Sequence, residues 1–253
     1  LPPRGDVTIT GGALTIGADL HAAPGGSISG RLDVSGNSVA AQIDGTSYEG
    51  TIGLAARLSS GEGGPKVLHL GGTELVLTNL FVPDVPRERQ EGWHATFGIP
   101  QGRLDLTNNS YSLDAFVQLG IRDTRPILAI LRKDPNTPKW LAFMPTLRDL
   151  QGGGQVQASP ASARITGFSL VGRSTDLRTE MHLTTNSLNG IAYARYGILS
   201  AGFDLRDPGK SQWRILGAKR WYERALASPF VVPASPEPEE PDPLEDPVPR
   251  PNP

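Results

Sequence analysis

The side chains best suited to metal binding are four histidines, and they lie far apart in the sequence. His21, His69, His94 and His182 are on different predicted strands, and none lies at metal-ligand spacing from another histidine. The chain has no Cys, so it has neither a disulfide framework nor a thiol nucleophile. The sequence therefore predicts no metal site and no cofactor.

The carboxylates offer one arrangement that could do chemistry. Asp105 and Asp114 could form an acid/base pair of the kind that hydrolyses glycosidic bonds, but carboxylates are common on exposed strand faces. No G-x-S-x-G elbow, P-loop, H-E-x-x-H or dinucleotide fingerprint is present. The run Gly152-Gly153-Gly154 lacks the Lys-Ser/Thr of a phosphate loop and is interpreted as a helix stop. We predict no catalytic residue and no enzyme.

The charge of the chain is concentrated at one end. The formal net charge is -2, yet the stretch from Pro233 to Pro253 holds six acidic residues, one Arg and nine prolines. We predict that residues 229–253 form a disordered Pro- and acid-rich tail, and that residues 1–228 form the folded domain. The body is close to neutral, which argues against a nucleic-acid partner. The opening LPPRGD is typical of a linker, so we expect a piece of a longer protein.

Short alternating segments separated by glycine turns make up most of the chain. In Lys66 to Val82 the apolar residues alternate with polar ones on both sides of Gly71-Gly72, which predicts a β-hairpin with a tight glycine turn. Gly11-Gly12, Ser35-Gly36-Asn37 and Asp44-Gly45 predict further turns. The longest clean alternation runs from Tyr111 to Ile121.

Two stretches have helical spacing instead. Thr124 and Pro126 are typical of a helix start, and the apolar residues that follow predict a helical pair inserted at 124–151. This pair either caps one end of the sheet or forms a lid. Residues 217–227 predict a short terminal helix with Trp221 and Leu226 facing the sheet.

The fold class predicted from these elements is all-β, a long curled antiparallel meander that is either an open groove or sandwich-like. A sheet with one apolar face must cover that face. It can close into a barrel, pair with a second sheet, or curl into a trough that holds an apolar ligand.

The repeated sequence pattern resembles that of AsmA-like and TamB-like proteins. The resemblance is carried by the unit Leu75-Val76-Leu77-Thr78-Asn79-Leu80-Phe81-Val82, by the block Leu147 to Gly152, and by the closing runs Tyr196 to Leu205 and Lys219 to Glu223. The resemblance is in the general pattern of alternating apolar residues and glycine turns, and it covers most of residues 7–227. It implies a groove in the periplasm of a diderm bacterium that conveys phospholipid between membranes, anchored in the inner membrane through a missing N-terminal segment. The lack of an anchor and the acidic end depart from the pattern.

We therefore expect a non-enzymatic envelope protein whose curled sheet binds acyl chains. Ordinary core packing would use the same residues. A structural or adhesive module with a dry core, and a carbohydrate-active enzyme, are the alternatives. The candidate groove residues are Leu68, Leu70, Leu75, Leu77, Leu113, Val117, Leu119, Leu177, Met181 and Leu183.

Overall fold

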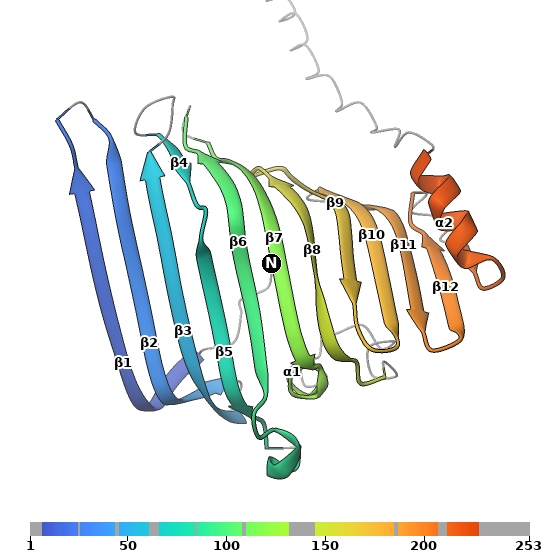
Figure 1. The fold of residues 1–253 in the computed structure, drawn as a ribbon, viewed down its shortest axis with the longest axis horizontal. Coiled ribbons are helices and arrows are strands. Elements are labelled where there is room, and N and C mark those ends of the chain that lie inside the picture. The colour runs from blue at the N-terminus through green and yellow to red at the C-terminus, as the bar shows by residue number, and fades with distance from the viewer. Residues whose placement is uncertain are drawn as a thin grey trace, which may run out of the picture.

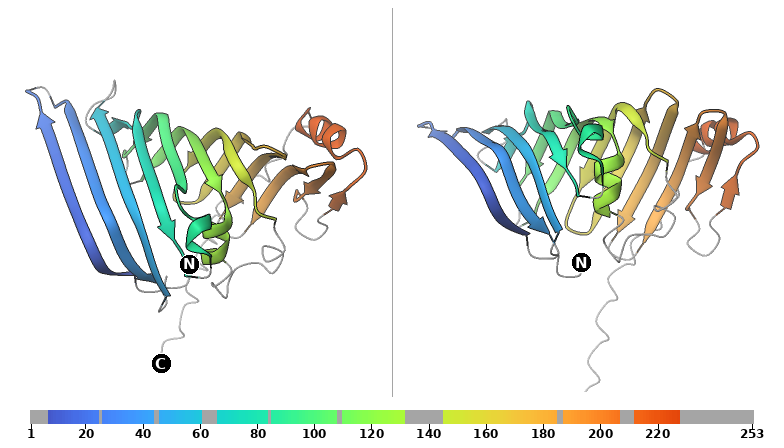
Figure 2. Two further views of the ribbon diagram at one scale, coloured as in Figure 1. Left: turned by 60° about the horizontal axis from the view of Figure 1, so that its bottom comes forward. Right: turned by 90° about the horizontal axis from the view of Figure 1, so that it is seen from below.

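The structure is a computed structural model, and it describes residues 7–24, 26–43, 46–60, 66–83, 85–107, 110–131, 145–184, 187–206 and 212–227. Within these residues, thirteen strands form one antiparallel sheet. Figures 1 and 2 show a single curved layer in which neighbours along the chain are mostly neighbours in the sheet. The predicted all-β curled meander is therefore confirmed.

The sheet begins with three very long strands and ends with a very short one. Its strands are β1 (Val7–Ala22), β2 (Ile28–Ile43), β3 (Thr46–Ser60), β4 (Val67–His69), β5 (Thr73–Phe81), β6 (His94–Asp105), β7 (Ser112–Asp123), β8 (Arg148–Ala158), β9 (Ser162–Val171), β10 (Thr175–Thr184), β11 (Leu188–Tyr196), β12 (Leu199–Asp204) and β13 (Gln212–Arg214).

Two of the glycine-containing runs that predict hairpin turns lie inside strands. Gly11 and Gly12 interrupt the pairing of β1 with β2 as a bulge, and β2 runs on through Gly36 to a bulge before Val39. A glycine bulge uses the same left-handed backbone as a tight turn, and Gly12 has φ of 92°. The predicted turns at these two positions were wrong for this reason. The predicted turn at Asp44-Gly45 lies outside the described residues.

The predicted hairpin at Lys66 to Val82 is also wrong. β4 and β5 occupy the same position in the sheet, one after the other, between β3 and β6. Both are antiparallel to those two strands. Gly72, with φ of 81°, donates its N–H to Ile99 O at 2.9 Å, so the chain stays bonded to β6 across the break. The two glycines thus offset one long strand and do not reverse it.

The helical insertion predicted at 124–151 is only partly correct. Helix α1 (Arg125–Leu131) begins after Thr124 as expected, and Asp123 Oδ1 accepts a hydrogen bond from the Arg125 N–H at 2.8 Å. Residues 148–151 belong to strand β8, and the three glycines predicted to stop a helix are in the middle of that strand. The short apolar run before the glycines fits either structure, and pairing with β7 and β9 decided for the strand. Residues 132–144 lie outside the described part.

The terminal helix α2 (Ala218–Ala227) packs on one face of β11 and β12. Figure 1 shows it at the C-terminal edge of the sheet. Ala218, Tyr222 and Ala225 are buried against Ile191 and Tyr193, with Trp221 partly buried beside them. Leu226 is 43% exposed, so its predicted inward position was wrong. The predicted tail at 229–253 lies outside the described residues.

Candidate functional site

The register of the sheet puts all ten candidate groove residues on one face. Residues directly opposite one another on antiparallel strands point to the same side. Leu119 on β7 lies opposite Phe97, which lies opposite Leu75, and the pairing through Gly152 and Leu170 leads on to Leu177.

The other candidates join this face by the same geometry. Leu68 is connected to Leu113 through Leu104, and Leu113 is connected to Leu183 through Ala158 and Ala163. Leu77, Val117 and Met181 are an even number of residues from Leu75, Leu119 and Leu177 on the same strands, so each points to the same face as that residue. A Cβ built on Gly102 would lie 3.3 Å from both Leu70 Cβ and Ala115 Cβ, which places Leu70 on this side as well. Alternation within each strand and the register between strands together produce this shared face, which we call the apolar face.

One line of residues crosses the apolar face from β1 to β12 without a charged or polar side chain. We call it the central row, and its members lie opposite one another from strand to strand: Ile16, Val34, Leu54, Leu75, Phe97, Leu119, Gly152, Leu170, Leu177, Ala194 and Ala201. Such a line is a continuous hydrocarbon strip at right angles to the strands.

The apolar face is only partly shielded from solvent. All ten candidates are half-buried, and at the β1 end of the face Ile16 is 67% exposed and Leu20 69% exposed. Among the described residues, no second sheet packs on this face. Large exposed apolar surfaces on proteins mark places where a partner, a membrane or a ligand sits.

Buried side chains form two clusters on opposite faces of the sheet. One cluster, on the apolar face where β7 leads into α1 and β8, consists of Leu147, Leu150 and Leu170, with Leu119 and Ile121 packed against it. The other is the α2 cluster, on the opposite face of the sheet. Leu170 is the one member of the central row that is fully buried in a cluster, and the row's members on β1 to β7 are not fully buried.

The segment between β5 and β6, which contains the 3-10 turn η1 (Arg87–Arg89), is held by several hydrogen bonds at one end of these strands. We call it the end structure. The Val82 N–H donates to Gln90 Oε1 at 2.6 Å, and Gln90 Nε2 donates to Val82 O at 3.0 Å and to Val85 O at 2.5 Å. Trp93 Nε1 donates to Asp123 O at 2.6 Å, which ties the start of β6 to the end of β7. Sequence reasoning missed these roles, because a polar loop with prolines gives no sign of which glutamine is buried.

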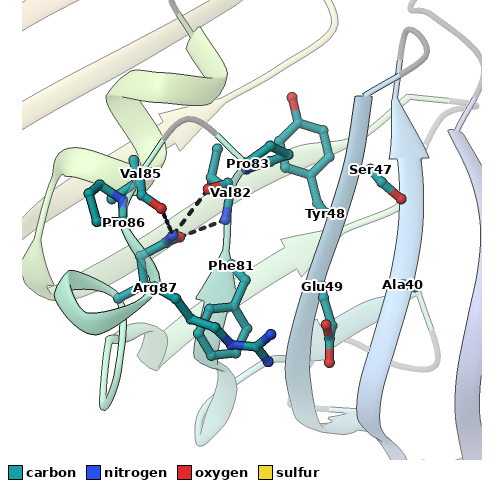
Figure 3. A pocket seen from close by; sticks show the side chains of 11 residues that line it. Ala40, Ser47, Tyr48, Glu49, Phe81, Val82, Pro83, Val85, Pro86 and Arg87 are labelled. Atoms are coloured by element: carbon teal, nitrogen blue, oxygen red, sulfur yellow. Dashed lines mark hydrogen bonds between the residues drawn. The ribbon is translucent and has the colours of Figure 1, made fainter.

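A pocket of about 600 Å³ lies between this end structure and β3. Figure 3 shows Phe81, Val82, Pro83 and Pro86 around it, with Glu49 and Arg87 beside them. The Arg87 guanidinium carbon is 4.4 Å from the centre of the Phe81 ring, which is a cation–π contact. The pocket has no set of convergent polar groups that would do chemistry, and none of the ten candidates lines it.

The opposite face of the sheet carries an equally continuous polar line. We call it the polar row: His21, Ser29, Ser59, His69, Arg103, Asp114, Gln157, Arg164, His182 and Asn189. It includes three of the four histidines, but intervening strands about 4.8 Å apart separate each from the next. Within the described residues, no group of three His, Asp or Glu side chains could hold a metal ion.

Asp105 and Asp114 are diagonal neighbours on β6 and β7 of the polar face. Arg103 lies opposite Asp114, and Ser112 lies opposite Asp105. Hydrogen bonds from Thr107, with help from Arg103, hold the pKa of Asp105 below its usual value. Asp114 accepts hydrogen bonds from the side-chain amides of Gln155 and Gln157. A general acid for glycoside hydrolysis needs a raised pKa, so Asp105 is poorly suited to that role.

Comparison with known proteins gives no relative from which a function could be carried over. No protein family, curated protein or solved structure matches the chain. Neither described helix has the length and apolar composition needed to span a bilayer.

Proposed function

We propose that this protein binds the acyl chains of a phospholipid on its apolar face and conveys them between the membranes of a diderm envelope, without catalysing a reaction. The observation that carries the proposal is the central row, which crosses the sheet without a charged side chain. From β1 to β7 its side chains are half-buried or exposed, and Leu170 on β9 is its one fully buried member. The placement in the periplasm, the AsmA-like identity and an inner-membrane anchor belong to the same proposal and come from the resemblance in sequence texture.

The physical basis is removal of methylene groups from water. Each methylene buried against Leu, Ile or Val contributes about 0.8 kcal/mol. An acyl chain lying along the central row would contact leucines from β5, β7, β9 and β10 in turn. The headgroup can stay in water because an open sheet leaves the rim of the face accessible.

The alternative is a structural or adhesive module with a dry core. Such a module covers its apolar face with its own second layer. In the part of the chain that the structure describes, one buried cluster is on β8 and β9 of the apolar face and the other lies under α2 on the opposite face. From β1 to β7 no member of the central row is fully buried, which favours the lipid proposal over this alternative.

The test uses two neighbouring residues of β5 that point to opposite faces. Leu75 and Val76 are both half-buried, Leu75 on the apolar face and Val76 on the polar face. We expect Leu75→Gln to weaken binding of a fluorescent fatty-acid probe and to reduce the phospholipid found by native mass spectrometry. Val76→Gln should leave both unchanged.

The controls separate binding from folding. Circular dichroism and thermal unfolding of both variants would show that each keeps the sheet. Equal loss in the two variants, or wild-type protein that neither carries lipid nor binds the probe, would rule out the proposed function.

A further inference from the structure

Strand β1 is a long edge with no described neighbour on its outer side. In the order of the sheet it pairs with β2 alone. The regular part of this pairing, beyond the bulges, runs from Ala13 to Ala22. An edge strand of this length presents unpaired backbone N–H and C=O groups that another strand can bond.

Beyond the bulge at Gly11-Gly12, β1 has few of the devices that usually prevent such pairing. It contains neither Lys nor Pro, and its two ionisable residues, Asp19 and His21, both lie on the polar face. On the apolar face, Ile16 and Leu20 are each more than half exposed. This edge therefore combines free hydrogen-bonding groups with an apolar stripe.

The opposite edge differs in both respects. β13 is three residues long, and α2 packs beside it on β11 and β12. A copy of the chain cannot use so short a strand to match the whole of β1. Among the edges of the described sheet, only β1 of a second copy is long enough to pair along the whole of β1.

We propose that β1 pairs with β1 of a second copy, antiparallel, about a two-fold axis at Gly17. In this register Leu14 lies opposite Leu20 of the second copy, Ile16 opposite Ala18, and Thr15 opposite Asp19. Like charges do not face one another, and the apolar faces of the two copies join into one. A shift by one residue would place Leu14 opposite His21 and break that continuity. The proposal rests on the edge alone and holds with or without lipid binding.

A cysteine at the two-fold axis tests the register. The chain has no Cys, and a Cβ added at Gly17 meets no atom within 4 Å, so Gly17→Cys fits the fold. We expect this variant to form a covalent dimer on oxidation, or with a short bismaleimide, much faster than Gln157→Cys. Gln157 is an exposed control in the central strand β8. Equal rates for the two variants would overturn the proposal.

A charge on the edge tests the interface itself. Ile16 and Ile215 are almost equally exposed, 67% and 69%, so lysine at either position leaves the folded sheet intact. By sedimentation, we expect the wild-type chain and Ile215→Lys to have the mass of two chains, and Ile16→Lys the mass of one. A single-chain mass for wild-type protein at high concentration, or a dimer that survives Ile16→Lys, would contradict pairing through β1.

Discussion

Phe97 on β6 lies directly opposite Leu119 on β7, on the apolar face. Although it is in the middle of the central row, Phe97 remains 39% exposed, because no described layer covers it. Under the proposed function, this exposed ring between two leucine-bearing strands would contact an acyl chain without displacing part of the protein.

A matched pair of phenylalanines tests this position. Phe116 is 37% exposed but lies on the polar face, opposite Gln101 and Gln155. Because both rings are partly exposed, each Phe→Ala change should cost less than the roughly 3–5 kcal/mol of a fully buried ring. We expect Phe97→Ala to weaken binding of the fatty-acid probe and Phe116→Ala to leave it unchanged, as measured by fluorescence titration. Equal effects would show that the probe does not distinguish the two faces.

Gly152 should not tolerate any side chain. A Cβ there would lie 1.7 Å from the backbone oxygen of Ser169, so β8 and β9 would have to separate. We expect Gly152→Ala to destabilise the protein by on the order of 1–3 kcal/mol in urea unfolding, as overpacking does. The control is Gly53→Ala, since an added Cβ at Gly53 meets nothing within 4 Å. That change should be neutral or mildly stabilising.

Gln90 should contribute more to stability than its place in a polar loop suggests. Its side chain is 2% exposed and bonds the backbone of Val82 and Val85. Gln90→Ala leaves those backbone groups without their partner, so the free energy of unfolding should fall by about 1–3 kcal/mol. Gln101→Ala, at an exposed position of β6, should change it little. Chemical denaturation of both variants makes the comparison.

The Asp204–Arg206 ion pair should stabilise the fold at neutral pH and lose this effect in acid, where Asp204 becomes protonated. Side-chain hydrogen bonds from Arg206, at 2.6 and 2.9 Å, hold the pKa of Asp204 below its usual value. A carboxylate whose pKa is lower in the folded protein than in the unfolded chain stabilises the fold above the unfolded pKa, and loses that effect as the pH falls through the folded pKa.

The pair can be tested by replacing the carboxylate. We expect Asp204→Asn to lower the melting temperature at pH 7, and the difference from wild type to shrink as the pH falls below the ordinary aspartate pKa and through the lowered pKa of Asp204. Arg206→Gln should show the same pH profile, since it removes the other half of the pair. A difference that persists unchanged at low pH would mean that Asp204 acts through packing and not through its charge.

The sequence by itself determined which residues of one strand share a face and where the regular helices begin. Side chains in a strand alternate with a period of two whatever the neighbours are, so Leu113, Val117 and Leu119 could be assigned to one face of their strand from their spacing. The register between strands then put the ten candidates on the same face of the sheet. Thr124 and Pro126 likewise marked the start of α1, because helix starts depend on residues within one turn. These features are local, and local features are readable from a single chain.

The tertiary structure alone decided what each glycine does and how the face is covered. A left-handed glycine suits a tight turn and a bulge equally, and pairing with β2 made Gly11-Gly12 a bulge. At Gly71-Gly72, pairing of β4 and β5 with the same two neighbours made the glycines an offset between strands and not a hairpin. The strand at Leu150 to Gly154 depends on β7 and β9 in the same way. Whether a second layer covers the central row is a property of contacts between distant segments. The spacing of apolar residues along the chain is the same whether such a layer is present or absent.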